Sequence, residues 1–168
     1  MKRWLPHIGI VVGILIAVYA LFFSTSDEDA IREQLERLEA VAAVSADDTN
    51  IVVRTAHVRK ELSELVTEDV TFEIPELTTE ERGRVALAGL AASAPRLFRT
   101  ASVDLDGLAI DIDQQATTAI ARGPAVLTGT RQSGELDGDR RTVAIRFDKI
   151  DGDWRVVSLS VSARESDL

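Results

Sequence analysis

Side chains that commonly carry acid–base or nucleophilic chemistry are scarce in this sequence of 168 residues. It contains no cysteine, which excludes a thiolate nucleophile, a disulfide and a zinc–thiolate site. His57 is the one histidine after residue 25, and such a side chain could titrate near neutral pH. It falls beside the apolar stripe of its predicted helix, which favours an exposed helix residue over a catalytic one. The sequence also lacks the G-x-S-x-G motif that would hold the nucleophile of a serine–histidine–aspartate triad, so no catalytic residue is predicted.

Aspartates recur at every second residue in two places, Asp104 with Asp106 and Asp111 with Asp113. Such pairs could suggest calcium, but they lack the D-x-D-x-D-G loop and the bidentate glutamate of a calcium-binding loop. Alternation at period two instead predicts the solvated face of a strand. Four other aspartates are predicted turn residues: Asp137, Asp139, Asp151 and Asp153. No metal site is predicted, and because no Gly-Lys-Ser/Thr phosphate loop occurs, no cofactor is predicted either.

The N-terminal segment is the longest apolar stretch. The run from Ile8 to Phe23 contains no charged residue, and with Leu5 to His7 it reaches the length a helix needs to cross about 30 Å of hydrocarbon. Basic residues precede it and acidic residues follow, so the amino terminus is expected on the cytoplasmic side. Residues 1–25 are therefore predicted to form a cytoplasmic start and a single-pass transmembrane anchor. A cleaved signal peptide shares the basic start and apolar middle, but no clean A-x-A cleavage site follows.

The charge and composition of the chain limit the kinds of partner it can bind and indicate where it is located. Of the 19 basic residues, Lys2 and Arg3 belong to the N-terminal segment, which leaves 17 against 28 acidic ones and a formal charge of −11. Such a surface is a poor partner for nucleic acid or anionic headgroups, whose affinity comes from neutralised phosphates. Only three of the basic residues are lysine, a bias typical of GC-rich bacterial coding. The expected location is the bacterial inner membrane, with the remaining chain on the periplasmic side.

Residues 26–163 are predicted to form one domain that begins with helices. Ser26 followed by Asp29 is typical of a helix start, and apolar residues continue at helical spacing to Val44. The segment from Asp47 to Asn50 can cap a second helix. Its apolar stripe is Ile51, Thr55, Val58, Leu62 and Leu65-Val66. A short strand from Val70 to Ile74 and a third helix from about Thr79 to Ala94 follow, and Pro95 ends that helix or begins a further turn.

After Thr100 the apolar pattern changes to period two, which predicts four strands. The predicted strands are Val103 to Asp113 with a bulge at Asp106-Gly107, Thr117 to Thr130 with a bulge or bend at Gly123-Pro124, Thr142 to Asp148, and Trp154 to Ser162. Gln132 to Asp139 is expected to be a polar connection, Asp151-Gly152 a turn, and residues 164–168 a loose tail. Helices segregated from a run of antiparallel strands indicate an α+β fold.

Three features resemble the nuclear transport factor two-like superfamily, which includes SnoaL-like and ketosteroid-isomerase-like proteins. They are the element order across residues 26–163, the passage from Ala94 to Phe98 into the strand at Val103, and the closing hairpin from Phe147 to Leu159 with its Asp-Gly turn and Trp154. The resemblance implies a cone-shaped domain, with about three helices packed on a curved, mainly antiparallel sheet. It also implies an apolar pocket at the open end of the cone, for which His57, Phe72 and Trp154 are the candidate lining residues. Trp154 could equally seal the sheet against the helices.

Two functions remain open for this domain. A steroid-isomerase-like site pairs an aspartate base with a tyrosine or a protonated acid, but the only tyrosine is Tyr19, inside the apolar run. We therefore favour a membrane-tethered, non-catalytic interaction or assembly domain outside the cytoplasm. Its expected partners are the lipid bilayer through the N-terminal helix, a membrane or envelope protein, and further copies of itself. The alternative is a small-ligand binder or a SnoaL-like enzyme that uses the cone pocket.

Overall fold

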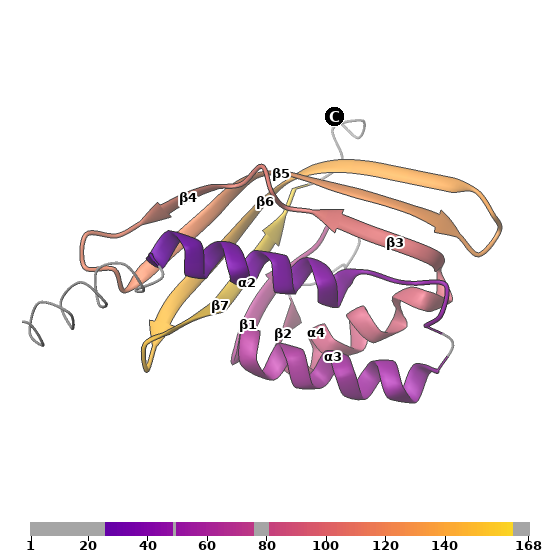
Figure 1. Ribbon diagram of the computed structural model, residues 1–168, viewed down its shortest axis with the longest axis horizontal. Helices are drawn as coiled ribbons and strands as arrows, with labels where there is room; N and C mark the ends of the chain where they lie inside the picture. Colours follow the sequence, from indigo (N-terminus) through magenta and orange to yellow (C-terminus); the bar gives the residue numbers. More distant parts are fainter. Residues whose placement is uncertain (1–25, 49, 76–80, 163–168) are drawn as a thin grey trace, which may run out of the picture.

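The computed structural model describes residues 26–48, 50–75 and 81–162. In this part of the chain, helices cover one side of a strongly bent sheet, and α2 lies across the strands (Figure 1). None of the helices among these residues is both long and apolar enough to cross a bilayer. The predicted anchor and the predicted tail at 164–168 lie outside the described residues. The α+β fold is confirmed.

Side chains just before the first two helices account for where they begin. In α2 (Asp27–Ala42), the Ser26 hydroxyl accepts a hydrogen bond from the Asp29 amide at 3.1 Å, which satisfies one of the free N–H groups of the first turn. In α3 (Ile51–Leu65), the Asn50 side chain accepts from the amides of residues 52 and 53. Both helix starts agree with the capping residues in the sequence.

The buried face of α3 differs from the predicted stripe. It consists of Arg54, Val58, Leu62 and Leu65, whereas Ile51 is 41% exposed. The first turn of the helix therefore buries Arg54, a charged residue, in place of the predicted Ile51. Arg54 is tolerated there because Asp48 lies 2.6 Å from its guanidinium, and burial of a charge requires such a partner. Apolar periodicity alone cannot detect a buried ion pair.

The predicted third helix begins later than expected. Strand β1 (Val66–Glu73) pairs with a short strand β2 (Glu81–Arg82), and α4 (Arg84–Ser93) starts only after them. Gly83 separates β2 from α4 with a φ of 99°, a left-handed conformation that glycine adopts without a steric penalty. The helix predicted from Thr79 was therefore too long at its N-terminal end. Pro95 lies in a 3-10 turn, η1 (Ala94–Arg96), in agreement with the predicted further turn.

Five strands follow η1, in place of the predicted four. They are β3 (Phe98–Asp104), β4 (Ala109–Ile112), β5 (Thr118–Arg131), β6 (Leu136–Ile150) and β7 (Asp153–Val161). The order across the described sheet is β2-β1-β7-β6-β5-β3, with β4 also paired to β5. Only β1 and β7 pair in parallel among these strands. The mixed, bent sheet agrees with the expected cone in outline.

The bulge predicted at Asp106-Gly107 is a complete break between β3 and β4. Both strands pair with β5, on either side of Gly123. A Cβ at Gly123 would lie 2.9 Å from the Gly107 carbonyl oxygen, so the crossing chains need glycine there. The β5–β6 register is continuous from Thr118 to Thr130, and no bulge occurs at Gly123-Pro124. Strand β6 also begins at Leu136, inside the predicted polar connection.

Candidate functional site

Large apolar side chains are buried in the described part of the domain. Phe147 is fully buried, Phe72 is 1% exposed and Trp154 is 3% exposed. Ile31 of α2 and Leu62 of α3 belong to the same buried core as Phe147 and Trp154, and close packing of this kind stabilises the fold. Of the predicted lining residues, Trp154 belongs to this core, Phe72 is buried on β1, and His57 is exposed on α3. None of these three side chains lines either of the two surface hollows described below.

A polar contact at the N-terminal end of α2 accounts for the position of Trp154. Its indole N–H donates to Asp27 Oδ1 at 2.9 Å, and the Lys149 ammonium donates to the same oxygen at 2.5 Å. That ammonium also lies 5.3 Å from the centroid of the Trp154 ring, a cation–π geometry. The hydrogen bond from Lys149, and then that from Trp154, lower the pKa of Asp27. The contact fastens the start of α2 to the β6–β7 hairpin, and sequence reasoning missed it because its members are far apart in the chain.

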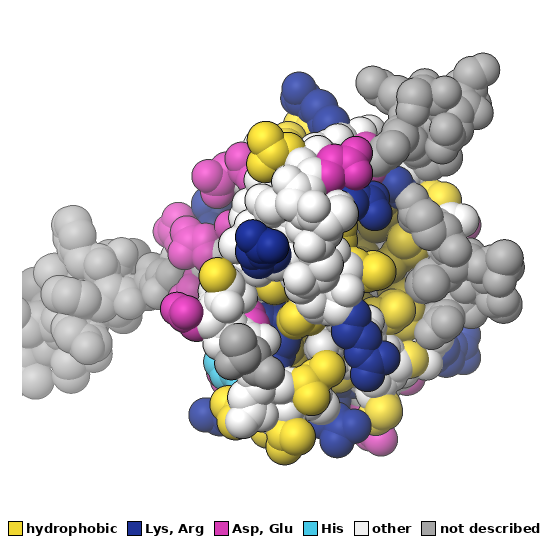
Figure 2. Space-filling model, turned by 90° about the vertical axis from the view of Figure 1, so that its right-hand side faces the viewer, with side chains coloured by type: hydrophobic (Ala, Val, Ile, Leu, Met, Phe, Trp, Pro, Cys, Tyr) yellow, Lys and Arg dark blue, Asp and Glu magenta, His cyan; other side chains and the backbone are white. Residues whose placement is uncertain are grey.

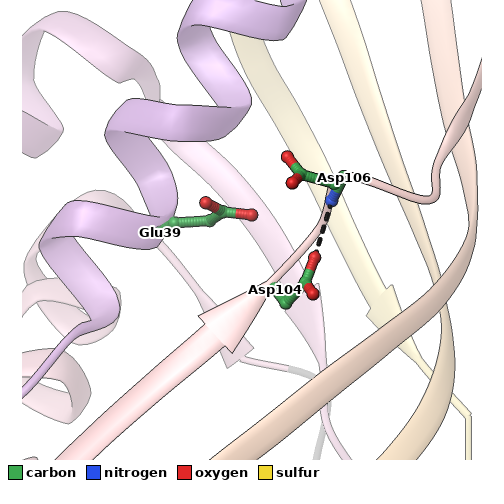
Figure 3. A group of neighbouring side chains, drawn as sticks. All are labelled: Glu39, Asp104 and Asp106. Carbon is green, nitrogen blue, oxygen red and sulfur yellow. Dashed lines mark hydrogen bonds between the residues drawn. The ribbon is translucent and has the colours of Figure 1, made fainter.

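Three carboxylates form a second cluster, shown in Figure 3. Glu39 of α2 points toward Asp104 at the end of β3 and Asp106 in the following turn, with carboxylate oxygens within 4.8 Å of one another. The Leu105 amide donates a hydrogen bond to Glu39, and the Asp106 amide donates to Asp104 at 3.0 Å. Burial raises the pKa of Glu39, and the negative charges of Asp106 and Asp104 raise it further.

This acidic cluster has a structural use in the turn between β3 and β4. Glu39 satisfies a backbone N–H that the break in the strand leaves unpaired, as buried amides require. Oxygen ligands suit Ca²⁺, but that ion takes roughly six to eight of them. Asp104 and Asp106 are exposed, as is Asp111, whereas Asp113 accepts three backbone N–H groups in the turn before β5. The hydrogen bond from Thr118 is the main cause that lowers the pKa of Asp113.

A hollow of about 570 Å³ lies over strands β3, β5 and β6. It is lined by small and hydroxyl-bearing residues: Thr100, Ala101, Ser102, Thr128, Gly129, Thr130, Leu136, Asp137 and Gly138. The Ser102 and Thr128 hydroxyls lie 2.9 Å apart, and the Asp137 carboxylate is paired with Arg131 at 2.5 Å. This surface offers hydrogen bonds and a flat contact area, with its one lining carboxylate already neutralised.

Another hollow, of about 400 Å³, lies at the end of the molecule opposite the start of α2; we call it the distal groove. Its lining residues are Ser45, Ala46, Asp48, Ile51, Pro95, Arg96, Phe98, Arg99 and Gln132. The Gln132 side chain donates to the carbonyls of Pro95 at 2.8 Å and Phe98 at 3.2 Å, so the β5–β6 turn is fixed to η1. Figure 2 shows this end of the molecule, where apolar and basic side chains reach the surface.

Apolar exposure is pronounced around the distal groove. Val52 is 73% exposed, Val53 64% and Leu97 62%. Arg96 and Arg99 are also exposed, and within residues 26–48, 50–75 and 81–162 neither has a carboxylate partner. Sequence reasoning missed this site because its residues come from three separate connections, and none of them forms a recognisable motif.

No protein-family model matches the sequence, and no curated protein matches it either. Solved structures do match. A nuclear transport factor 2-like superfamily protein from Salmonella enterica serovar Typhimurium aligns with a TM-score of 0.65 and 18% identity, over 83% of this chain and 92% of that one. A hexachlorocyclohexane dehydrochlorinase, LinA type 2, aligns with a TM-score of 0.64 and 12% identity, over 80% of this chain and 83% of that one.

The association domain of CaMKII from C. elegans is also similar, with a TM-score of 0.59 and 14% identity, over 81% of this chain and 94% of that one. These identities establish the fold alone, which is that of the nuclear transport factor 2-like superfamily. The expected resemblance is thereby confirmed for the fold. Because the similar structures include both an enzyme and an association domain, function has to be argued from the site.

Proposed function

We propose that residues 26–163 form a non-catalytic interaction or assembly domain, which residues 1–25 tether to a membrane with the domain outside the cytoplasm. One observation carries the proposal: apolar side chains gather at the surface of the distal end, where Val52, Val53 and Leu97 are all exposed. Fully burying a side chain such as Val52 or Leu97 contributes about 1.5–3 kcal/mol. Apolar residues that surround a groove are typical of surfaces that meet another protein.

The comparison with known structures supports an assembly role in general terms. A domain with this fold in C. elegans CaMKII is an association domain. The partner of the present chain would be a membrane or envelope protein, or another copy of itself. The alternative, a ligand-binding or SnoaL-like enzymatic domain, has one observation in its favour. Glu39 has a raised pKa, which is a property of many acid–base residues. That carboxylate is, however, engaged by the Leu105 amide at a surface turn.

The mass of the full chain, extracted in a mild detergent, tests the proposal. Size-exclusion chromatography with light scattering should give a protein mass above that of the monomer, or reveal a stoichiometric partner. The double variant V52D/L97D should return the chain to a lone monomer, because it places charge within the exposed apolar surface. Val85 is 75% exposed on α4, away from the distal groove, so V85D is the matched control and should leave the mass unchanged.

A wild-type chain that emerges alone and monomeric under mild conditions would refute the assembly function. The tether is tested separately. Protease added to spheroplasts should remove the domain and leave the N-terminal segment, whereas full protection would show that the proposed orientation is wrong.

A further inference from the structure

We infer that the distal groove binds an acidic segment of a partner protein, one in which carboxylates flank an apolar side chain. The inference rests on the proposed interaction function and names the chemistry of the partner. It follows from two properties that coincide at this site. Arg96 and Arg99, which have no carboxylate partner among residues 26–48, 50–75 and 81–162, lie there in a chain that is otherwise strongly acidic, and exposed apolar residues lie beside them.

The arginines at the groove differ in whether they have an ion-pair partner. Arg54, just beneath it, is paired with Asp48 at 2.6 Å and donates to the Ala91 carbonyl at 3.2 Å. By contrast, Arg96 and Arg99 form no ion pair with any carboxylate in the part of the chain that the structure describes. Arginine binds carboxylates through paired N–H groups, so two lining arginines that no described carboxylate neutralises favour a ligand with negative charge.

Apolar side chains near these arginines restrict the ligand further. Ile51 and Phe98 line the groove, and Leu97 is 62% exposed beside them. A free inorganic anion would use the arginines and leave this apolar surface in water. A peptide segment with an apolar side chain between carboxylates would use both, since interfaces combine an apolar centre with a polar rim.

The walls of the groove are held in place before any ligand arrives. Gln132 fastens the β5–β6 turn to η1 through its side chain and through its amide, which donates to the Leu97 carbonyl at 3.0 Å. Asp48 accepts from the Ser45 amide at 3.0 Å as well as from Arg54. A preformed surface loses little conformational freedom on binding, which favours recognition of a short segment.

Position argues for a protein segment over a lipid headgroup. The groove and the N-terminal end of α2 lie at opposite ends of the molecule (Figure 1). A membrane reached through the chain before Ser26 would therefore adjoin the end that holds Asp27, and the groove would face away from it. The same two ends differ in charge, because α2 begins with three acidic residues.

Peptide binding to the full chain in a mild detergent tests the inference, with fluorescence anisotropy as the readout. The probes are labelled seven-residue peptides that alternate Glu with Leu, Glu with Ser, or Lys with Leu. The Glu/Leu peptide should bind most tightly, and the double variant R96E/R99E should weaken it by about tenfold or more. R96K/R99K, which keeps the charge, should retain most of the binding. Higher salt should weaken binding because these contacts are exposed.

The matched control is R122E/R146E, on the sheet. Both arginines are exposed and lie on neighbouring strands outside the groove, and this variant should leave binding unchanged. Equal weakening by the two double variants would show nonspecific charge attraction and overturn the inference. So would a Glu/Leu peptide that binds no tighter than the Lys/Leu peptide. Vesicles rich in phosphatidylserine that bind through Arg96 and Arg99 would also overturn it, in favour of a lipid.

Failure of this inference can be told from failure of the proposed function. A chain that assembles in detergent but does not bind the acidic peptide keeps its interaction role and loses the assigned partner chemistry. A chain that is a lone monomer and does not bind the acidic peptide loses both the interaction role and the assigned partner chemistry. Circular dichroism of each variant shows whether it folds, and the charge-keeping R96K/R99K variant separates lost charge from lost structure.

Discussion

The ion pair between Arg54 and Asp48 gives a sharp test of how this domain tolerates a buried charge. The Arg54 side chain is 6% exposed, and its guanidinium lies 2.6 Å from the Asp48 carboxylate. Asp48→Asn removes the negative charge but keeps an oxygen that can accept from the Ser45 amide. The guanidinium would then be buried without its counter-charge. Removing one partner of a fully buried pair costs about 3–5 kcal/mol.

The expected cost of Asp48→Asn is smaller than this limit, because the Asp48 side chain is 30% exposed and water can reach the pair from that side. We expect a loss of about 2–3 kcal/mol in the free energy of unfolding. Arg54→Met removes the charge together with the need for a partner, and it refills the space of the arginine stem. Its cost should stay within about 1 kcal/mol, mainly for the hydrogen bond to the Ala91 carbonyl.

Urea unfolding of the full chain measures both changes, with Trp154 fluorescence as the signal in a background that carries Trp4→Phe. The Asp48→Asn midpoint should fall by about 1 M, and the Arg54→Met midpoint by less than half of that. The double variant should resemble Arg54→Met, because without the guanidinium the carboxylate has little to stabilise. If Arg54→Met proves as destabilising as Asp48→Asn, the reasoning is refuted and Arg54 acts through packing.

Three further changes test separate contacts. Asp27→Asn should destabilise the domain by about 1–2 kcal/mol at neutral pH. Because the hydrogen bond from Lys149 lowers the pKa of Asp27, the difference in unfolding free energy from the wild type should persist above pH 4 and vanish as the pH falls through the lowered pKa. Urea unfolding across this pH range measures it. Gly129→Ala would bring a Cβ within 2.7 Å of a backbone oxygen of β3 and should cost about 1–3 kcal/mol in thermal unfolding, whereas Gly138→Ala, whose nearest contact is 3.9 Å away, should be nearly neutral. Glu39→Gln should stabilise the domain slightly at pH 7, because burial disfavours the charged carboxylate, as its raised pKa indicates. The gain in unfolding free energy should disappear below pH 4.5, where the wild-type carboxyl is protonated in both states. A loss of stability at pH 7 would contradict this account.

Local signals in the sequence were sufficient for several elements. Ser26 and Asn50 mark helix starts because a cap involves only the next few residues. The closing hairpin is equally local, since Asp151 and Gly152 both adopt positive φ in its turn. Alternation of apolar residues then identifies the last strand, β7. The α+β class follows from these elements and their order.

Features that depend on distant contacts were not predictable in the same way. Trp154 and Asp27 lie 127 residues apart, and no spacing rule connects them. Glu39 accepts a hydrogen bond from the turn after β3 across 66 residues, and no local pattern in the sequence indicates that contact. Glu81 and Arg82, inside the third predicted helix, form a strand because β1 offers an edge to pair with, and tertiary pairing outweighs local helical periodicity.

Helix α2 spans the distance between the point where the proposed tether would enter the domain and the candidate binding site. The helix has 16 residues and is therefore about 24 Å long. Its first turn is held by Lys149 and Trp154, and the chain just beyond its last turn is held by the bridge between Val44 and Ala101. A tether that enters at Asp27 would thus fix the direction of the whole domain, with the distal groove turned away from the membrane. Attachment and recognition would then be separable: loosening the contacts of Asp27 should change how the groove is presented, and leave its affinity for an acidic segment intact.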